Sequence, residues 1–146
     1  MQVVDTNLLV YAHRRDCPDH ERARKWLESL ATGSEEWAVT WSNVHEFLGV
    51  VTNARIWREP TPMEHALKQM RAWTASPVCR VLGEPSGYLD GLAEILLASG
   101  VTGARVHDAR VFAIAKAHGA RELLTCDRDF SRFGGLVVRN PLLRAP

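Results

Sequence analysis

Short apolar runs alternate with longer amphipathic stretches along this chain. Apolar runs of strand composition lie at residues 2–5, 36–41, 78–82, 122–126 and 136–138. Apolar positions at helical spacing lie between them, at residues 6–13, 20–32, 43–51, 62–75, 88–99 and 107–118. Strands that alternate with helices favour a parallel sheet covered on both faces. We therefore expect one α/β domain over residues 1–146, with a central parallel sheet of four to five short strands flanked by helices.

Residues that begin and end helices agree with these boundaries. Asp19 and Ser42 are suitable N-caps, and Pro62 is well placed at a first helical position. Gly33 and Gly119 fit helix ends. The stretch 107–118 is apolar on most faces, which predicts a central helix.

The tryptophans divide into two groups. Trp26, Trp37, Trp41 and Trp73 fall at positions typical of a core. Trp57 lies in a polar stretch, where packing in the core or in a dimer competes with contact to RNA or a partner.

Composition excludes several classes of protein. The net charge of +1 over 146 residues excludes a generally basic surface for nucleic acid, so any such function needs local basic clusters. No apolar stretch approaches the roughly 20 residues of a membrane span. The three cysteines form no C-x-x-C pair, and a reducing, cytoplasmic location is the simplest one for them.

Acidic residues stand where the sheet is expected to end. Asp5 closes the first strand, and Asp127 and Asp129 follow the fourth. Asp108 lies in the first turn of the central helix, and Glu46 lies near the start of the helix after the second strand. Active sites of open parallel sheets form at the carboxyl ends of the strands. We therefore expect these acids to converge at one edge of the sheet.

Convergence would have chemical consequences. Two carboxylates about 4 Å apart repel by about 4 kcal/mol at an effective dielectric constant near 20, so such a group takes up protons or binds a cation. Oxygen ligands suit Mg²⁺ and Mn²⁺, which activate water and neutralise charge on a reacting phosphate. Each acid also has an ordinary structural interpretation when taken alone: Asp108 as a helix cap, Asp5 as a turn residue and Glu46 as a surface residue.

Four segments, taken in order, give the sequence its resemblance to a known family. They are residues 4–11 (VDTNLLVY), 43–47 (NVHEF), 107–115 (HDARVFAIA) and 124–130 (LTCDRDF). This chain resembles the PIN-domain ribonucleases, specifically VapC-type toxins of type II (VapBC) toxin–antitoxin systems. The segments span nearly its whole length. A haloacid-dehalogenase-like phosphatase also begins with a strand-end aspartate, but it requires a second acid where this chain has Asn7.

The resemblance implies an active site built on an acidic quartet. Its members would be both catalytic residues and ligands of one or two Mg²⁺ or Mn²⁺ ions: Asp5, Glu46, Asp108 and Asp127. Asp129 would be a neighbouring acid that does not bind the metal directly. Thr6 and Asn7 would orient Asp5, and Thr125 would contact a metal-bound water or the phosphate. Cys126 departs from the family, which often has a small polar residue or alanine there.

The resemblance also implies a substrate and partners. The activity would be that of an endoribonuclease, in which a metal-activated water hydrolyses an RNA phosphodiester and leaves a 5′-phosphate. The candidates for RNA phosphate contacts are Arg14, Arg15, Arg110 and Arg128. Arg110, two residues after Asp108, could also neutralise the quartet when metal is absent. A homodimer and a cognate VapB-type antitoxin are the expected partners.

One interpretation from a different class stays open, a catalytically silent PIN-like module that binds RNA or protein. The complete acidic quartet argues against it, because converging carboxylates that bind nothing are costly to keep together.

Overall fold

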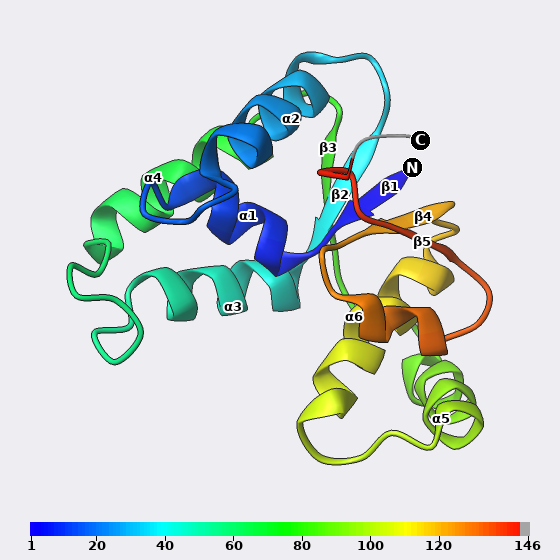
Figure 1. Ribbon diagram of the computed structural model, residues 1–146. Coiled ribbons are helices and arrows are strands. Elements are labelled where there is room, and N and C mark those ends of the chain that lie inside the picture. The colour runs from blue at the N-terminus through cyan, green and yellow to red at the C-terminus, as the bar shows by residue number, and fades with distance from the viewer. Residues whose placement is uncertain (144–146) are drawn as a thin grey trace.

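The computed structural model describes residues 1–143, and its centre is a five-stranded parallel sheet (Figure 1). The strands are β1 (Gln2–Val4), β2 (Trp37–Thr40), β3 (Cys79–Leu82), β4 (Glu122–Leu124) and β5 (Val137–Arg139). Their order across the sheet is β3-β2-β1-β4-β5, with every neighbouring pair parallel. The predicted α/β fold with a parallel sheet is confirmed. The last three residues of the expected domain, 144–146, lie outside the described residues.

Helices cover both faces of the sheet (Figure 1). They are α1 (Thr6–His13), α2 (His20–Thr32), α3 (Trp41–Val51), α4 (Met63–Thr74), α5 (Tyr88–Ser99) and α6 (Val106–Ala117), with short 3₁₀ turns η1 (Gly103–Arg105) and η2 (Arg128–Arg132). The apolar residues of α1 to α4 form one core with one side of the sheet, and those of α5 and α6 form a second core with the other side. None of the helices within residues 1–143 is long and apolar enough to cross a membrane.

The central strand serves both cores at once. Val3 and Val4 of β1 are completely buried, and because successive side chains of a strand point to opposite faces, Val3 joins the core under α6 and Val4 joins the core under α1. Helix α6 is apolar around most of its circumference, and Phe112 and Ile114 are completely buried. Its predicted central position is therefore confirmed.

The start of α3 differs from the prediction. The N-cap is Thr40, the last residue of β2, instead of Ser42. Thr40 Oγ1 accepts a hydrogen bond from the Asn43 backbone N–H at 3.1 Å, and Asn43 Oδ1 accepts one from the Thr40 N–H at 3.0 Å. This reciprocal capping box lets the chain pass from strand to helix without a loop. It also fixes Asn43, which is completely buried, below the carboxyl end of β1.

The prediction of a core position is wrong for one of the four tryptophans. Trp41 lies in the first turn of α3 with 49% of its surface exposed, and its ring lies 6.4 Å from that of His45. The capping box sets this outcome, because it starts the helix at Trp41 and directs that first side chain outward. Trp57 is half-buried, donates from Nε1 to the Val50 carbonyl at 2.8 Å and packs against the Arg14 guanidinium.

Candidate active site

Asp5 lies at the carboxyl end of the central strand and caps α1. Its Oδ1 accepts a hydrogen bond from the Thr6 backbone N–H at 2.8 Å. Its Oδ2 accepts bonds from Thr125 Oγ1 at 2.7 Å and Asn7 Nδ2 at 3.1 Å. The residue is only 6% exposed, so its carboxyl group is held by donors from two parts of the chain in a nearly dry site.

Burial raises the pKa of Asp5 to about 7, and the negative charges of Glu46 and Asp108 add to this rise. The hydrogen bonds from Thr125 and Thr6 act in the opposite direction, because they favour the ionised carboxylate. Near neutral pH, Asp5 is therefore divided between its two protonation states. A nearby cation would favour the ionised state, so this carboxyl group is poised to bind one.

Glu46 approaches the same position from α3. Its Oε2 accepts a hydrogen bond from Thr6 Oγ1 at 3.0 Å, and Thr6 Oγ1 in turn accepts one from Asn43 Nδ2 at 3.1 Å. The same Asn43 nitrogen lies 3.5 Å from Asp5 Oδ1. Thr6 and Asn43 therefore link Glu46 to Asp5. Asn43 is not among the site residues predicted from the sequence, although its place three residues after Thr40 marks it as part of a capping box.

Asn7 ties the first helix to the loop after β4. Its Nδ2 donates to Thr125 Oγ1 at 3.0 Å as well as to Asp5, and its Oδ1 accepts from the Cys126 backbone N–H at 3.2 Å. The Cys126 thiol points elsewhere, toward Asn140 Oδ1 at 3.5 Å. The backbone N–H of residue 126 makes the contact to Asn7, so cysteine at this position leaves the site intact.

The remaining acids gather around one arginine. Arg105 Nη1 lies 3.0 Å from Asp108 Oδ2 and 3.4 Å from Asp127 Oδ2, and its Nη2 pairs with Asp129 Oδ2. Asp127 caps η2, since its Oδ1 accepts from the Asp129 backbone N–H at 2.8 Å. Three carboxylates from two distant segments therefore share a single guanidinium group.

The predicted acids thus form two groups at one edge of the sheet. Asp5 and Glu46 are linked through Thr6, and Asp108, Asp127 and Asp129 are linked through Arg105. Asp108 is close enough to Asp5 to raise its pKa. Within residues 1–143, no three His, Cys, Asp or Glu side chains are arranged closely enough to hold a metal ion as they stand. The donor set nonetheless fits a hard divalent cation, because all its members are carboxylates and three of them already bind one cation, Arg105.

The sequence suggested that Arg110 could neutralise the acidic quartet, but in the structure it does not contact these acids. It pairs with Glu84 instead, with Nε 2.7 Å from Glu84 Oε1. Residues three apart share a helix face, whereas residues two apart do not. Arg105, three residues before Asp108, therefore reaches the acids, and Arg110, two residues after it, points away. The spacing of three residues between Arg105 and Asp108 is the signal in the sequence that could have identified Arg105 as the partner of the acids.

The other predicted phosphate contacts differ in their surroundings. Arg14 is buried: it makes two bonds to Asp16, at 2.9 and 2.6 Å, and donates to the Glu59 carbonyl at 2.9 Å, with its guanidinium 4.2 Å from the Trp57 ring centroid. Arg15 and Arg128 are exposed. Arg128 directly follows Asp127, whereas Arg15 lies beyond the far end of α1 from Asp5.

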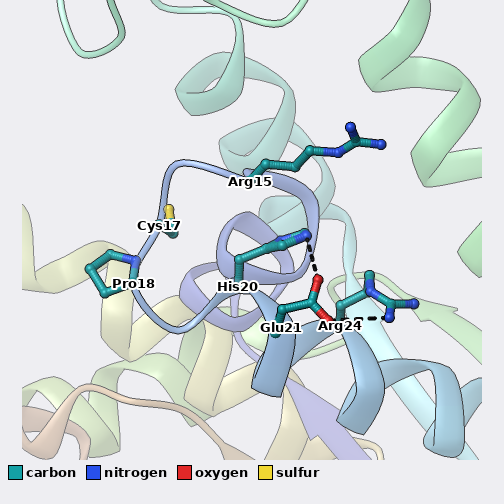
Figure 2. A pocket seen from close by; sticks show the side chains of 6 residues that line it. All are labelled: Arg15, Cys17, Pro18, His20, Glu21 and Arg24. Atoms are coloured by element: carbon teal, nitrogen blue, oxygen red, sulfur yellow. Dashed lines mark hydrogen bonds and ion pairs between the residues drawn. The ribbon is translucent and has the colours of Figure 1, made fainter.

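Arg15 helps to line a separate open cavity of about 690 Å³ (Figure 2). Cys17, Pro18, His20, Glu21 and Arg24 complete its lining. The cavity lies between the loop after α1 and the first turns of α2, and no member of the acidic quartet contributes to it.

The structure is thus an α/β fold with a parallel sheet in the order β3-β2-β1-β4-β5 and acidic residues grouped at the carboxyl edge of that sheet. The chain belongs to the PIN-domain family, since the sequence model described as "PIN domain" matches residues 3–136. The predicted family is confirmed.

Named relatives support a closer placement within that family. The chain is 34% identical over 142 residues to "Ribonuclease VapC43" of Mycobacterium tuberculosis, covering 97% of this chain and 96% of that protein. It is 29% identical over 141 residues to "Ribonuclease VapC37" of the same species, covering 97% of each. The fold also matches the crystal structure of VapBC2 from Rickettsia felis bound to a promoter DNA fragment, with a TM-score of 0.70 and 18% identity over 95% of this chain and 97% of that one.

Proposed function

We propose that this protein is an endoribonuclease that acts as the toxin of a toxin–antitoxin pair and hydrolyses RNA phosphodiester bonds with a water activated by Mg²⁺ or Mn²⁺. The observation that carries the proposal is the burial of the Asp5 carboxyl group beside other acids, which raises its pKa. A carboxyl group this deeply buried, with two further acids close enough to raise its pKa, is suited to a cation. Relatives that match almost the whole chain are named ribonucleases.

The residues that would hold one or two metal ions are the acidic quartet, Asp5, Glu46, Asp108 and Asp127. A bound Mg²⁺ or Mn²⁺ would lower the pKa of water and neutralise charge on the reacting phosphate. Thr6, Asn7 and Thr125 fix the orientation of Asp5 through the bonds described above. Asp129 holds Arg105 beside the quartet.

Proton transfer would fall to the accessible acids. Glu46 is exposed, with one oxygen anchored by Thr6, so it can orient a water molecule and accept its proton. Asp108 is the alternative base, at the start of α6 on the other side of the site. Either acid can take a proton without disturbing the buried bonds that hold Asp5.

The substrate would be bound through its phosphates. Among the four candidate arginines, Arg128 is best placed, because it is exposed and follows Asp127 directly. Arg15 would meet more distant phosphates beyond α1. Arg14 and Arg110 would have to leave the ion pairs with Asp16 and Glu84 before they could bind RNA.

The partners would be a cognate VapB-type antitoxin and a second copy of this chain. The R. felis structure is that of VapBC2 bound to a promoter DNA fragment, which motivates an equivalent complex here. An antitoxin arginine placed among the acids would inhibit the enzyme by occupying the position of the cation.

The test is cleavage of total RNA by purified, antitoxin-free protein, with Mg²⁺, Mn²⁺ or EDTA. We expect discrete fragments with 5′-phosphate ends that require metal and disappear in Asp5→Asn and Asp108→Asn. Asp90→Asn is the matched control, because Asp90 is an exposed acid in the first turn of α5. Equal cleavage by the Asp5 and Asp108 variants would reveal a contaminating nuclease. Folded wild type that binds RNA but cuts none would favour the catalytically silent module.

A further inference from the structure

We propose that Arg105 is an internal cation that competes with the divalent metal for the carboxylates of the active site, and thereby sets the metal concentration at which the site fills. This inference rests on the proposed function, since it concerns the same metal site. It assigns a role to a residue that belongs to neither the quartet nor the candidate RNA contacts.

The position of Arg105 makes it a bridge between two segments. It is the last residue of η1 and immediately precedes α6, which carries Asp108. Asp127 and Asp129 belong to the loop after β4. Among residues 1–143, no other basic side chain forms an ion pair with these three acids. Arg105 therefore supplies the counter-charge that holds the start of α6 against this loop.

The guanidinium and a metal would need the same oxygen atoms. Nη1 of Arg105 faces Oδ2 of both Asp108 and Asp127, which are two of the four acids proposed as metal ligands. Magnesium–oxygen distances are about 2.1 Å, so an ion bound to these oxygens would displace the N–H groups directed at them. Two cations cannot share these lone pairs at such distances without strong repulsion.

The balance of charge permits such an exchange. Three carboxylates and one guanidinium leave a net charge of minus two in the cluster, so a divalent ion still gains from binding there. The Arg105 side chain is 38% exposed, so its guanidinium has a path into solvent when it is displaced. If the arginine were completely buried, a metal ion that took its carboxylate partners would leave the guanidinium without any hydrogen-bond partner, not even water.

The experiment is a calorimetric titration of the purified, antitoxin-free protein with Mn²⁺ alone, in the absence of RNA. We expect Arg105→Gln to bind Mn²⁺ about tenfold more tightly than the wild type, because one competing charge a few ångströms from the ion is gone. Arg105→Lys keeps the charge and should stay closer to the wild type.

A matched control is Arg24→Gln. Arg24 also pairs with two carboxylates, Glu21 at 3.4 Å and Glu28 at 3.1 Å, but on the exposed surface of α2 (Figure 2 shows the pair with Glu21). Its removal should leave the Mn²⁺ affinity unchanged. Circular dichroism verifies that each variant is folded.

A second measurement covers the case in which Arg105→Gln fails to fold. In wild-type protein labelled with ¹⁵N-arginine, the Nη–H signals of Arg105, which face the three carboxylates, should be protected from exchange without metal and lose that protection as Mg²⁺ is added. A signal that Mg²⁺ leaves unchanged while the metal binds would overturn the proposal.

The possible outcomes separate this inference from the proposed function. Unchanged or weaker Mn²⁺ binding by Arg105→Gln, with normal binding by the wild type, overturns the role of Arg105 alone. Absence of Mn²⁺ binding in every variant overturns both the competition and the metal dependence. Tight Mn²⁺ binding without any RNA cleavage overturns the proposed nuclease and leaves the competition standing.

Discussion

The hydroxyl of Thr125 donates a hydrogen bond to Oδ2 of Asp5 at 2.7 Å, and so joins two residues 120 positions apart. Thr125 Oγ1 also accepts hydrogen bonds from Asn7 Nδ2 and from the Asp127 backbone N–H, each at 3.0 Å. One buried hydroxyl therefore sets the position of the central carboxylate and of the loop that carries Asp127.

Thr125→Val should weaken the site without removing any acid. Asp5 loses a donor to its ionised form, so its pKa should rise further, and the Asp127 N–H loses its acceptor. We expect the protein to lose about 1–3 kcal/mol of stability in urea unfolding. The acidic limb of the RNA cleavage profile should also move to higher pH. Thr125→Ser retains the hydroxyl and should resemble the wild type; equal profiles for all three proteins would contradict the assigned bond.

Asp5→Asn should stabilise the metal-free protein at neutral and alkaline pH while abolishing cleavage. The pKa of Asp5 is raised from 3.8 to about 7 on folding, so ionisation opposes folding. The cost is small near pH 4, grows as the pH rises to about 7, and then stays constant at up to about 4 kcal/mol. In the variant, the amide NH₂ must face one of the groups that donate to Asp5, and this contact reduces the gain in stability. We therefore expect a net gain of about 1–3 kcal/mol at pH 8.

The measurement for Asp5→Asn is the difference in unfolding free energy between variant and wild type, in EDTA, from pH 4 to pH 9. The difference should widen from pH 4 to pH 7 and then level off. A difference that does not vary with pH would show that Asp5 ionises normally in the folded protein. Added Mn²⁺ should reverse the order by stabilising the wild type.

Arg14→Gln should act mainly on stability. The buried guanidinium holds Asp16 and the Glu59 carbonyl and covers Trp57, so the variant leaves several groups without their partner. We expect a loss of about 2 kcal/mol in thermal or urea unfolding. Arg15→Gln, at the exposed neighbouring position, should change stability by less than about 0.5 kcal/mol. Similar small losses from both would contradict the structural role of Arg14.

The cysteines should resist alkylation in the folded protein. Burial raises the pKa of Cys79 to about 12 and that of Cys126 to about 11, and it raises the pKa of Cys17 as well. Thiolate is the reactive form, so iodoacetamide at pH 8 should label none of the three within minutes. In denaturant all three should react, as counted by mass spectrometry. Rapid labelling of Cys126 in the native protein would place its thiol in a more polar environment than the structure does.

Local sequence pattern predicted the elements better than their contacts. Buried strands and the apolar circumference of α6 follow from composition, and so does the placement of acids at strand ends. The start of α3 was missed, because both Thr40 and Ser42 are acceptable caps and only the reciprocal bond from Asn43 distinguishes them. The exposure of Trp41 depends on that same bond.

The order of the strands and the role of Arg105 needed the folded chain. Hydrophobic periodicity carries no information about which strands are neighbours, so the pairing of β1 with β4 could not be derived from it. The spacing of Arg105 and Asp108 is a local signal. Its contacts to Asp127 and Asp129 exist only because β4 delivers the following loop to the start of α6.

The pairing of the first strand with the fourth has a consequence for synthesis on the ribosome. Asp5 emerges early, but its partner Thr125 and the loop with Asp127 are translated 120 codons or more later. A nascent chain therefore carries the central carboxylate without the groups that orient it. A nascent copy of the proposed nuclease can act only after nearly the whole described chain has left the ribosome, so it cannot cleave the message it is read from until its own synthesis is almost complete.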